Sequence, residues 1–138
     1  MAGQYPTFMN VPLHTDLATL EAEIAILGVP YGDLAAAGST RTLMDRTVAE
    51  VFAVMRAAGY RTHWEEPGQF LEIFYHRLVP DTARHESSML QDLTAGKRTE
   101  IDALNGAVIR LAQEHGIAVP YNRAVYNLIR FLETARGG

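Results

Sequence analysis

The sequence of 138 residues lacks cysteine, has no long apolar run and carries no excess of basic charge. The absence of cysteine excludes disulfides, thiolate nucleophiles and cysteine-ligated zinc, and it suits a cytoplasmic protein. Neither 18 consecutive apolar residues nor a basic, apolar N-terminus is present, so we predict no membrane span and no signal peptide. The net charge of −4 is spread along the chain and argues against a nucleic-acid partner. With 48% hydrophobic residues, the chain fits one soluble domain with its own core.

Two further kinds of site are not indicated by the motifs. The five histidines form neither an H-E-x-x-H motif nor a pair four residues apart, so no metal site is predicted. Gly28 and Gly32 follow an apolar run, but the second glycine of G-x-G-x-x-G is missing and Pro30 removes a backbone donor. We therefore interpret residues 28–32 as a turn, and no cofactor site is predicted there.

The first 40 residues are interpreted as an N-terminal extension. Glycine and proline recur in it, and its one apolar run predicts at most one short strand, at residues 24–29. A lone strand cannot bury itself, so this segment either packs on the rest of the domain, pairs with a second copy, or stays loose. All three alternatives remain open.

Residues 41–138 are interpreted as a compact, mainly α-helical domain of about five helices. The predicted helices cover about 40–58, 68–79 and 86–94, then one that begins with a capping box at Thr99 and one that opens at Pro120. Gly59, Gly96 and Gly116 mark helix ends, and Pro80 is expected to end the second helix. The expected core positions are Met44, Val48, Val51, Phe52 and Met55 in the first helix, Ile101, Leu104, Val108 and Leu111 in the fourth, and Val125, Leu128, Ile129 and Leu132 in the last. The second helix has apolar residues nearly all round and is expected to be the most buried.

The densest polar stretch lies at residues 87–100. Glu100 is expected at the first position of a helix, where the helix dipole stabilises its charge and its side chain can bind a ligand. The alternative is that Ser87 or Ser88 only caps a helix and that Lys97 and Arg98 form a solvated corner. Spacing alone favours this alternative.

A set of motifs changes that balance. They are Glu50 with Gly59, SSMLQD at residues 87–92, GKRTEID at 96–102, LNG at 104–106 and GIAVPYN at 116–122. Together they resemble the C-terminal helical domain of ketopantoate reductase (2-dehydropantoate 2-reductase) over about residues 41–133. In that family the domain faces an N-terminal dinucleotide-binding domain, ketopantoate lies between the two, and NADPH delivers hydride.

The resemblance implies a role for individual residues. Ser88 is similar to the serine that hydrogen-bonds the substrate carboxylate. Glu100 is similar to the acid that binds the substrate hydroxyl and assists the proton relay, so it is the candidate catalytic residue as well as a substrate-binding one. Asp102 and Asn105–Gly106 correspond to supporting or packing positions.

The family's G-x-G-x-x-G turn and its general-acid lysine have no counterpart before Arg41. We therefore expect a stand-alone substrate-binding and dimerisation domain that is catalytically incomplete alone, binds no cofactor by itself, and meets NADPH only through a partner domain. An alternative is one component of a split NADPH-dependent 2-dehydropantoate 2-reductase of pantothenate biosynthesis. The expected partners are a second copy of the chain or a separate nucleotide-binding chain, and a small keto- or hydroxy-acid.

A weaker resemblance concerns residues 7–41. The segments FMNVP at residues 8–12 and AILGVPYGD at 25–33 are similar to the N-terminal edge of the agmatinase and arginase (ureohydrolase) family. That resemblance implies a first strand and loop, but the family's metal-ligand motifs are absent from this sequence. A ureohydrolase-related fragment is therefore the third hypothesis.

Overall fold

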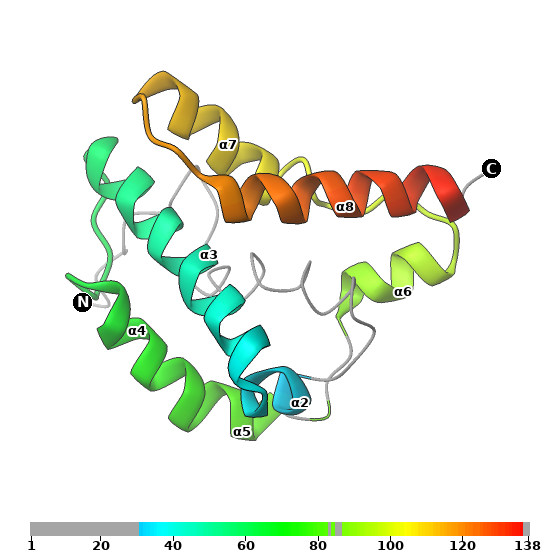
Figure 1. Ribbon diagram of the computed structural model, residues 1–138, viewed down its shortest axis with the longest axis horizontal. Coiled ribbons are helices and arrows are strands. Elements are labelled where there is room, and N and C mark those ends of the chain that lie inside the picture. The colour runs from blue at the N-terminus through cyan, green and yellow to red at the C-terminus, as the bar shows by residue number, and fades with distance from the viewer. Residues whose placement is uncertain (1–30, 83, 85–86, 137–138) are drawn as a thin grey trace, which may run out of the picture.

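The computed structural model describes residues 31–82, 84 and 87–136, and in this part of the chain all regular structure is helical (Figure 1). The mainly α-helical class is thus confirmed. The elements are α2 (Tyr31–Ala36), α3 (Gly38–Ala57), α4 (Pro67–Ile73), the π-helical η3 (Phe74–Leu78), α5 (Val79–Thr82), α6 (Ser88–Thr94), α7 (Asn105–Glu114) and α8 (Pro120–Arg136). The strand expected at residues 24–29 lies outside the described residues.

Helix α3 follows its predicted pattern. All five expected core positions on it are buried, with exposed fractions of 5% or less. Gly59 has a φ of 79°, which lets the chain turn so that Tyr60 N donates to Met55 O at 2.9 Å. This closes the helix in a Schellman motif. The short helix α2 just before it was not expected, because we interpreted the glycines up to residue 32 as a turn.

The second predicted helix is longer than expected and changes its winding. Pro80 does not end it but lies inside α5, and the preceding turn widens into η3, where Val79 N donates to Phe74 O five residues back. Since proline lacks an N–H and its ring crowds the carbonyl four residues earlier, a widened turn accommodates it. This helix is not the most buried one. In α7, seven of ten residues are buried.

Helix α7 starts five residues later than predicted, at Asn105 instead of Glu100. Residues 100–104 form one separate turn, in which Glu100 O accepts from Ala103 N and Leu104 N at 3.0 and 3.1 Å. The backbone of Leu104, with φ −98° and ψ −94°, then interrupts the helical path. The predicted capping box does not form. It would pair Thr99 N with the Asp102 side chain, but Thr99 N donates to Glu133 on α8 instead.

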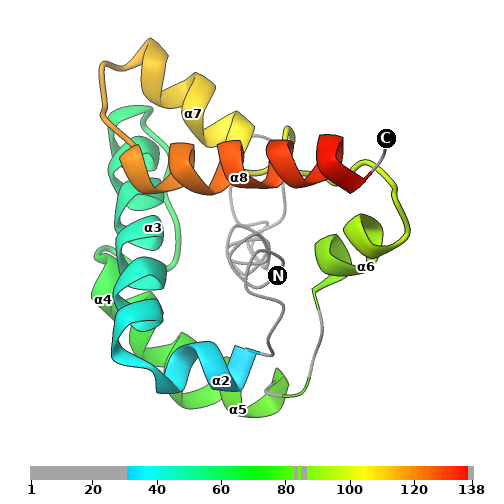
Figure 2. The ribbon, with the colours of Figure 1, turned by 45° about the vertical axis from the view of Figure 1, so that its right-hand side comes forward.

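Helix α8 lies along α7 and crosses α3, and α6 lies beneath its C-terminal half (Figures 1 and 2). One core cluster joins α3, α4, η3, α5 and α7. A second, smaller cluster joins α6, residues 101–104 and α8. On α8, Val125 and Ile129 are buried as expected, whereas Leu128 is 48% exposed and points away from the core. The helix is amphipathic as predicted, but Leu128 belongs to its outer face.

Candidate functional site

The two candidate site residues lie on segments that the sequence separates by 12 positions. Ser88 is the first residue of α6, and Glu100 opens the isolated turn 100–104. Both side chains are exposed, while the residues that follow them, Met89 and Ile101, are 2% and 0% exposed. Each segment therefore anchors an apolar residue in the core and presents a polar one to solvent. Glu100 does not stand at the start of a helix as expected, so its charge gains nothing from the dipole of α7.

Helix α8 is the common platform of both segments. The second core cluster contains Met89 and Leu93 from α6, Ile101 and Leu104 from the turn, and Val125 and Ile129 from α8. Ser87 is buried and caps α6 by accepting from Leu90 N at 3.3 Å, which fixes the backbone beside Ser88. Apolar packing on α8 thus places the Ser88 and Glu100 backbones relative to each other.

Polar contacts from α8 hold the chain just before Glu100. Glu133 Oε1 accepts from both Thr99 N and Thr99 Oγ1 at 2.7 Å, and Glu133 Oε2 accepts from Arg130 Nη1 at 2.8 Å. Thr99 Oγ1 in turn accepts from Ile101 N at 3.2 Å. The residues on either side of Glu100 are therefore tied down.

Asp102 makes the second link between the turn and α8. Its Oδ1 accepts from Tyr126 Oη at 2.7 Å, and its Oδ2 lies 3.4 Å from Arg98 and 3.8 Å from Arg130. The hydrogen bond to Asp102, followed by burial, raises the pKa of Tyr126 above its usual value. Helix α7 approaches this ring closely at Gly106, where a Cβ would lie 3.2 Å from Tyr126 Cε2.

A buried polar network joins α3, α7 and α8 behind the site. Glu50 accepts from Tyr121 N and Asn122 N at 2.9 Å, and from Asn122 Nδ2 at 2.8 Å. Asn122 Oδ1 accepts from Asn105 Nδ2 at 3.0 Å, and both asparagines are fully buried. The packing role expected for Asn105 fits these contacts.

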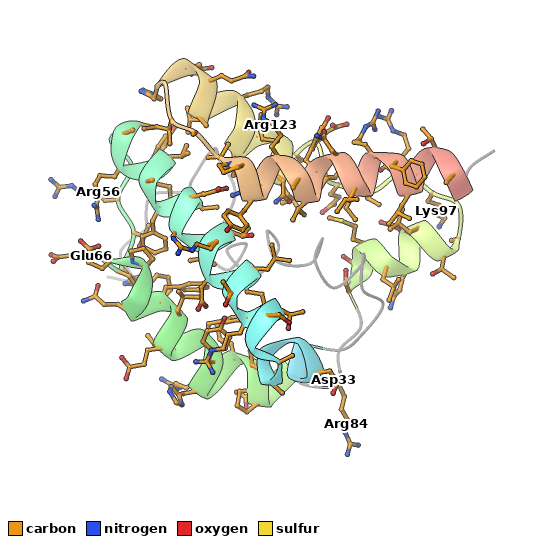
Figure 3. All side chains as sticks on the ribbon, in the orientation of Figure 1. Asp33, Arg56, Glu66, Arg84, Lys97 and Arg123 are labelled. Carbon is orange, nitrogen blue, oxygen red and sulfur yellow. The ribbon has the colours of Figure 1, made fainter. Side chains whose placement is uncertain are left out.

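The charges around the site are mixed. Figure 3 shows Lys97 near the C-terminal half of α8. Arg56 and Glu66, an exposed ion pair 3.1 Å apart, lie on the opposite side of the molecule. Ser88 carries a hydroxyl donor and Glu100 a carboxylate acceptor, which are groups that can hydrogen-bond a small polar ligand. Among the described residues, no group of three potential ligands could hold a metal ion. In the same part of the chain, no helix is both long and apolar enough to cross a membrane.

The described helices also offer no strand-to-helix glycine turn of the kind that binds a dinucleotide.

Comparison with known proteins decides the family. The family model described as "Ketopantoate reductase PanE/ApbA C terminal" matches residues 17–133, which is 117 of 138 residues. The chain belongs to this family. Among curated relatives, the 2-dehydropantoate 2-reductase of Aquifex aeolicus is 38% identical over 79% of this chain and 35% of its own length. That of Yersinia pestis is 39% identical over 67% of this chain and 29% of its own length. The chain thus spans about a third of the length of the curated relatives it matches.

Solved structures show the same fold. A PanE/ApbA family ketopantoate reductase from Ralstonia eutropha superposes with a TM-score of 0.78 at 31% identity, covering 94% of this chain and 46% of that one. A D-mandelate dehydrogenase, solved with NADH and anilino(oxo)acetate, superposes with a TM-score of 0.75 at 24% identity, over 89% of this chain and 50% of that one. At that identity the likeness concerns the fold.

These matches do not show the resemblance to ureohydrolases. Most of the segment on which it rested, residues 7–41, falls inside the ketopantoate reductase match, and residues 7–30 lie outside the described structure. The family match begins at residue 17, earlier than the domain boundary that we expect near residue 41. That boundary remains a prediction.

Sequence reasoning singled out Ser88 and Glu100 but missed the roles of Asn122, Tyr126 and Glu133. The side chain of Asn122 belongs to the buried network with Glu50 and Asn105, and those of Tyr126 and Glu133 hold residues 99–102. Asn122 lies in the GIAVPYN motif, so the motif was a signal for it. Tyr126 and Glu133 lie in an ordinary amphipathic helix, and only the folded structure connects them to the turn.

Proposed function

We propose that this chain is a substrate-binding domain of the 2-dehydropantoate 2-reductase type, which binds a small 2-keto- or 2-hydroxy-acid at Ser88 and Glu100. Ser88 Oγ would donate to the ligand carboxylate, and the Glu100 carboxylate would accept from its hydroxyl group. The observation that carries the proposal is that two exposed polar residues, both matched to family motifs, rest on one shared apolar cluster against α8. With the two backbones held in place, only the two side chains have to be ordered when a ligand binds.

Titration of the purified chain with pantoate and with 2-dehydropantoate tests this proposal. A ligand at 100 times its dissociation constant stabilises the folded chain by about 2.7 kcal/mol, which corresponds to a shift of several degrees in thermal unfolding. We expect Ser88→Ala and Glu100→Gln each to weaken binding by about tenfold, since the first removes a hydrogen bond to a charged carboxylate and the second replaces a charged acceptor by a neutral one.

Two matched controls change the same groups elsewhere. Ser39→Ala and Glu114→Gln alter an exposed serine and an exposed glutamate on α3 and α7 and should leave binding as it is. If the parent chain shows no shift with either acid at millimolar concentration, the binding proposal is wrong.

A second candidate is one component of an NADPH-dependent 2-dehydropantoate 2-reductase that completes its site with a nucleotide-binding part supplied by another chain. It is supported by the curated relatives of this chain, which are 2-dehydropantoate 2-reductases. Adding the nucleotide-binding portion of that relative to this chain should restore oxidation of NADPH by 2-dehydropantoate. No turnover at any ratio of the two would exclude this candidate for that pair.

We further propose that two copies pair through the outer face of α8. Tyr121, Leu128 and Phe131 are 37%, 48% and 65% exposed and lie on one face of the helix. The ketopantoate reductase of Staphylococcus aureus, described as dimeric, superposes with a TM-score of 0.65 at 20% identity. The cytoplasmic location stays a prediction.

A further inference from the structure

We propose that Glu133 is a positioning residue, which fixes the backbone of residues 99–104 and thereby sets where Glu100 meets its ligand. The effect on the ligand rests on the proposed function, because Glu100 is the residue that Glu133 serves. Glu133 itself is not expected to contact the ligand, because its side chain is almost buried against Thr99.

The surroundings of Glu133 are unusual for an acidic residue on a terminal helix. Its side chain is only 7% exposed, although charged side chains are rarely buried without partners. Both oxygens are used: Oε1 accepts two hydrogen bonds from Thr99, and Oε2 accepts one from Arg130. A carboxylate that accepts several good hydrogen bonds is stabilised despite its burial, so the geometry is specific.

The contacts of Glu133 end one residue before Glu100. The backbone N–H and the hydroxyl group of Thr99 both donate hydrogen bonds to Glu133, and the Thr99 hydroxyl oxygen accepts one from Ile101 N. Glu133 Oε1 thus holds the 98–99 peptide directly and the 100–101 peptide through the Thr99 hydroxyl, so the backbone is fixed on both sides of Glu100. The Glu100 side chain is exposed, and this backbone sets the region that its carboxylate can reach.

Arg130 connects this contact to the other link of the turn. Its Nη1 lies 2.8 Å from Glu133 Oε2 and 3.8 Å from Asp102 Oδ2, so one guanidinium orients the acid on each side of the turn. An ion pair between residues three apart on a half-exposed helix face contributes little stability by itself. We therefore infer that the ion pair between Arg130 and Glu133 serves mainly to hold the shape of the turn.

The test compares Glu133→Gln with three other variants. Glutamine keeps the size but loses the charge. Its amide oxygen can accept from Thr99 or from Arg130, whereas its NH2 group can accept from neither, so one of the two contacts is lost and the other loses its charge. Thr99→Val removes the hydroxyl and keeps the shape, whereas Thr99→Ser keeps the hydroxyl and serves as the conservative rescue. Glu114→Gln makes the same chemical change at an exposed residue of α7 and is the matched control.

Two readouts are taken well below the unfolding temperature. The first is the dissociation constant for pantoate by calorimetry, and the second is hydrogen exchange of the backbone amides of residues 99–104 by NMR. We expect Glu133→Gln to speed exchange at Thr99 and Ile101 by about tenfold and to weaken pantoate binding by about tenfold. Thr99→Val should show the same pattern more weakly, and Thr99→Ser and Glu114→Gln should match the parent chain.

Unchanged exchange in Glu133→Gln and Thr99→Val overturns the inference. Faster exchange with unchanged pantoate affinity overturns the part that concerns Glu100. If the parent chain does not bind pantoate at all, the proposed function fails, and the exchange measurements still decide whether Glu133 fixes the turn. Thr99→Val supplies the same decision if Glu133→Gln does not fold.

Discussion

Tyr75 shows how one side chain can tie two helices together and respond to pH. It reaches from η3 to α3, where its hydroxyl donates to Asp45 at 2.5 Å, and the Arg41 guanidinium lies over its ring, 3.9 Å from the centroid. Burial, followed by the hydrogen bond to Asp45 and the charge of that residue, raises the pKa of Tyr75 far above its usual value of 10.0. The folded chain therefore keeps this proton at a pH at which the unfolded chain loses it.

This gives a signed prediction for alkaline solution. A raised pKa in the folded state contributes stability that is fully present below about pH 10 and is lost as pH rises further, because the unfolded state then binds fewer protons. Urea denaturation between about pH 8 and about pH 11.5 should show a steeper loss of stability for the parent chain than for Tyr75→Phe. At neutral pH, Tyr75→Phe should cost about 1 kcal/mol through its lost hydrogen bond.

The control is Tyr121→Phe, the same change at an exposed tyrosine of α8. It should alter stability at neutral pH by less than about 0.5 kcal/mol. Parallel pH profiles for Tyr75→Phe and the parent chain would contradict the prediction.

Single residues were the least predictable part of the site. Ser88 and Glu100 could be proposed from motifs because both lie in a short stretch with a distinctive order of residue types. Glu133 and Thr99 are 34 residues apart, and the sequence marks Thr99 only as a cap for its own segment. A hydrogen bond between a loop and a distant helix depends on their relative placement, which local pattern does not specify.

At the scale of elements, the N-terminus of α8 is bound to the side of α3. The Glu50 carboxylate lies at the N-terminus of α8 and accepts from Tyr121 N and Asn122 N, so a residue of one helix caps another. The first backbone N–H groups of a helix have no partner within it, and a negative charge there is also favoured by the helix dipole. This contact holds the N-terminus of α8 against α3.

Removing that cap should destabilise the fold. Glu50→Ala leaves two backbone donors and the Asn122 side chain short of a partner, and we expect a loss of about 2–3 kcal/mol in the free energy of unfolding. Glu50→Gln retains an acceptor without the charge and should lose about half as much. Glu72→Ala, at an exposed position of α4, is the control and should change stability by less than about 0.5 kcal/mol. The measurement is urea denaturation followed by circular dichroism, and equal midpoints for all variants would exclude a capping role.

The elements themselves were largely predictable, and their errors have physical causes. Helices α3, α6 and α8 begin and end within about two residues of the predicted positions, because apolar stripes and glycine ends are local signals. The prediction for α7 was wrong at its start, since the Thr99 donor is used by Glu133 on another helix. The prediction that Pro80 ends its helix is wrong because the π turn η3 accommodates the proline, and no local sequence signal marks such a turn.

At the scale of the whole molecule, the outer face of α8 sets the expected assembly. Light scattering should give a mass near twice the 15.3 kDa of one chain at micromolar concentration. Leu128→Glu combined with Phe131→Glu places two charges on the exposed apolar face and should leave a monomer with unchanged helix content. Ala53→Glu, at an exposed position of α3, adds a charge elsewhere and should not affect the mass. A parent chain that stays monomeric at high micromolar concentration would contradict the proposed pairing.

The use of α8 as a platform also orders events during synthesis. Residues 87–104 leave the ribosome before α8 does, yet the apolar cluster that holds them is completed only by Val125 and Ile129, and the turn before Glu100 only by Glu133. A nascent chain halted before α8 can therefore form α3 but cannot assemble the candidate binding residues. In the cell, the chain would therefore gain the ability to bind its ligand only after α8 has been translated.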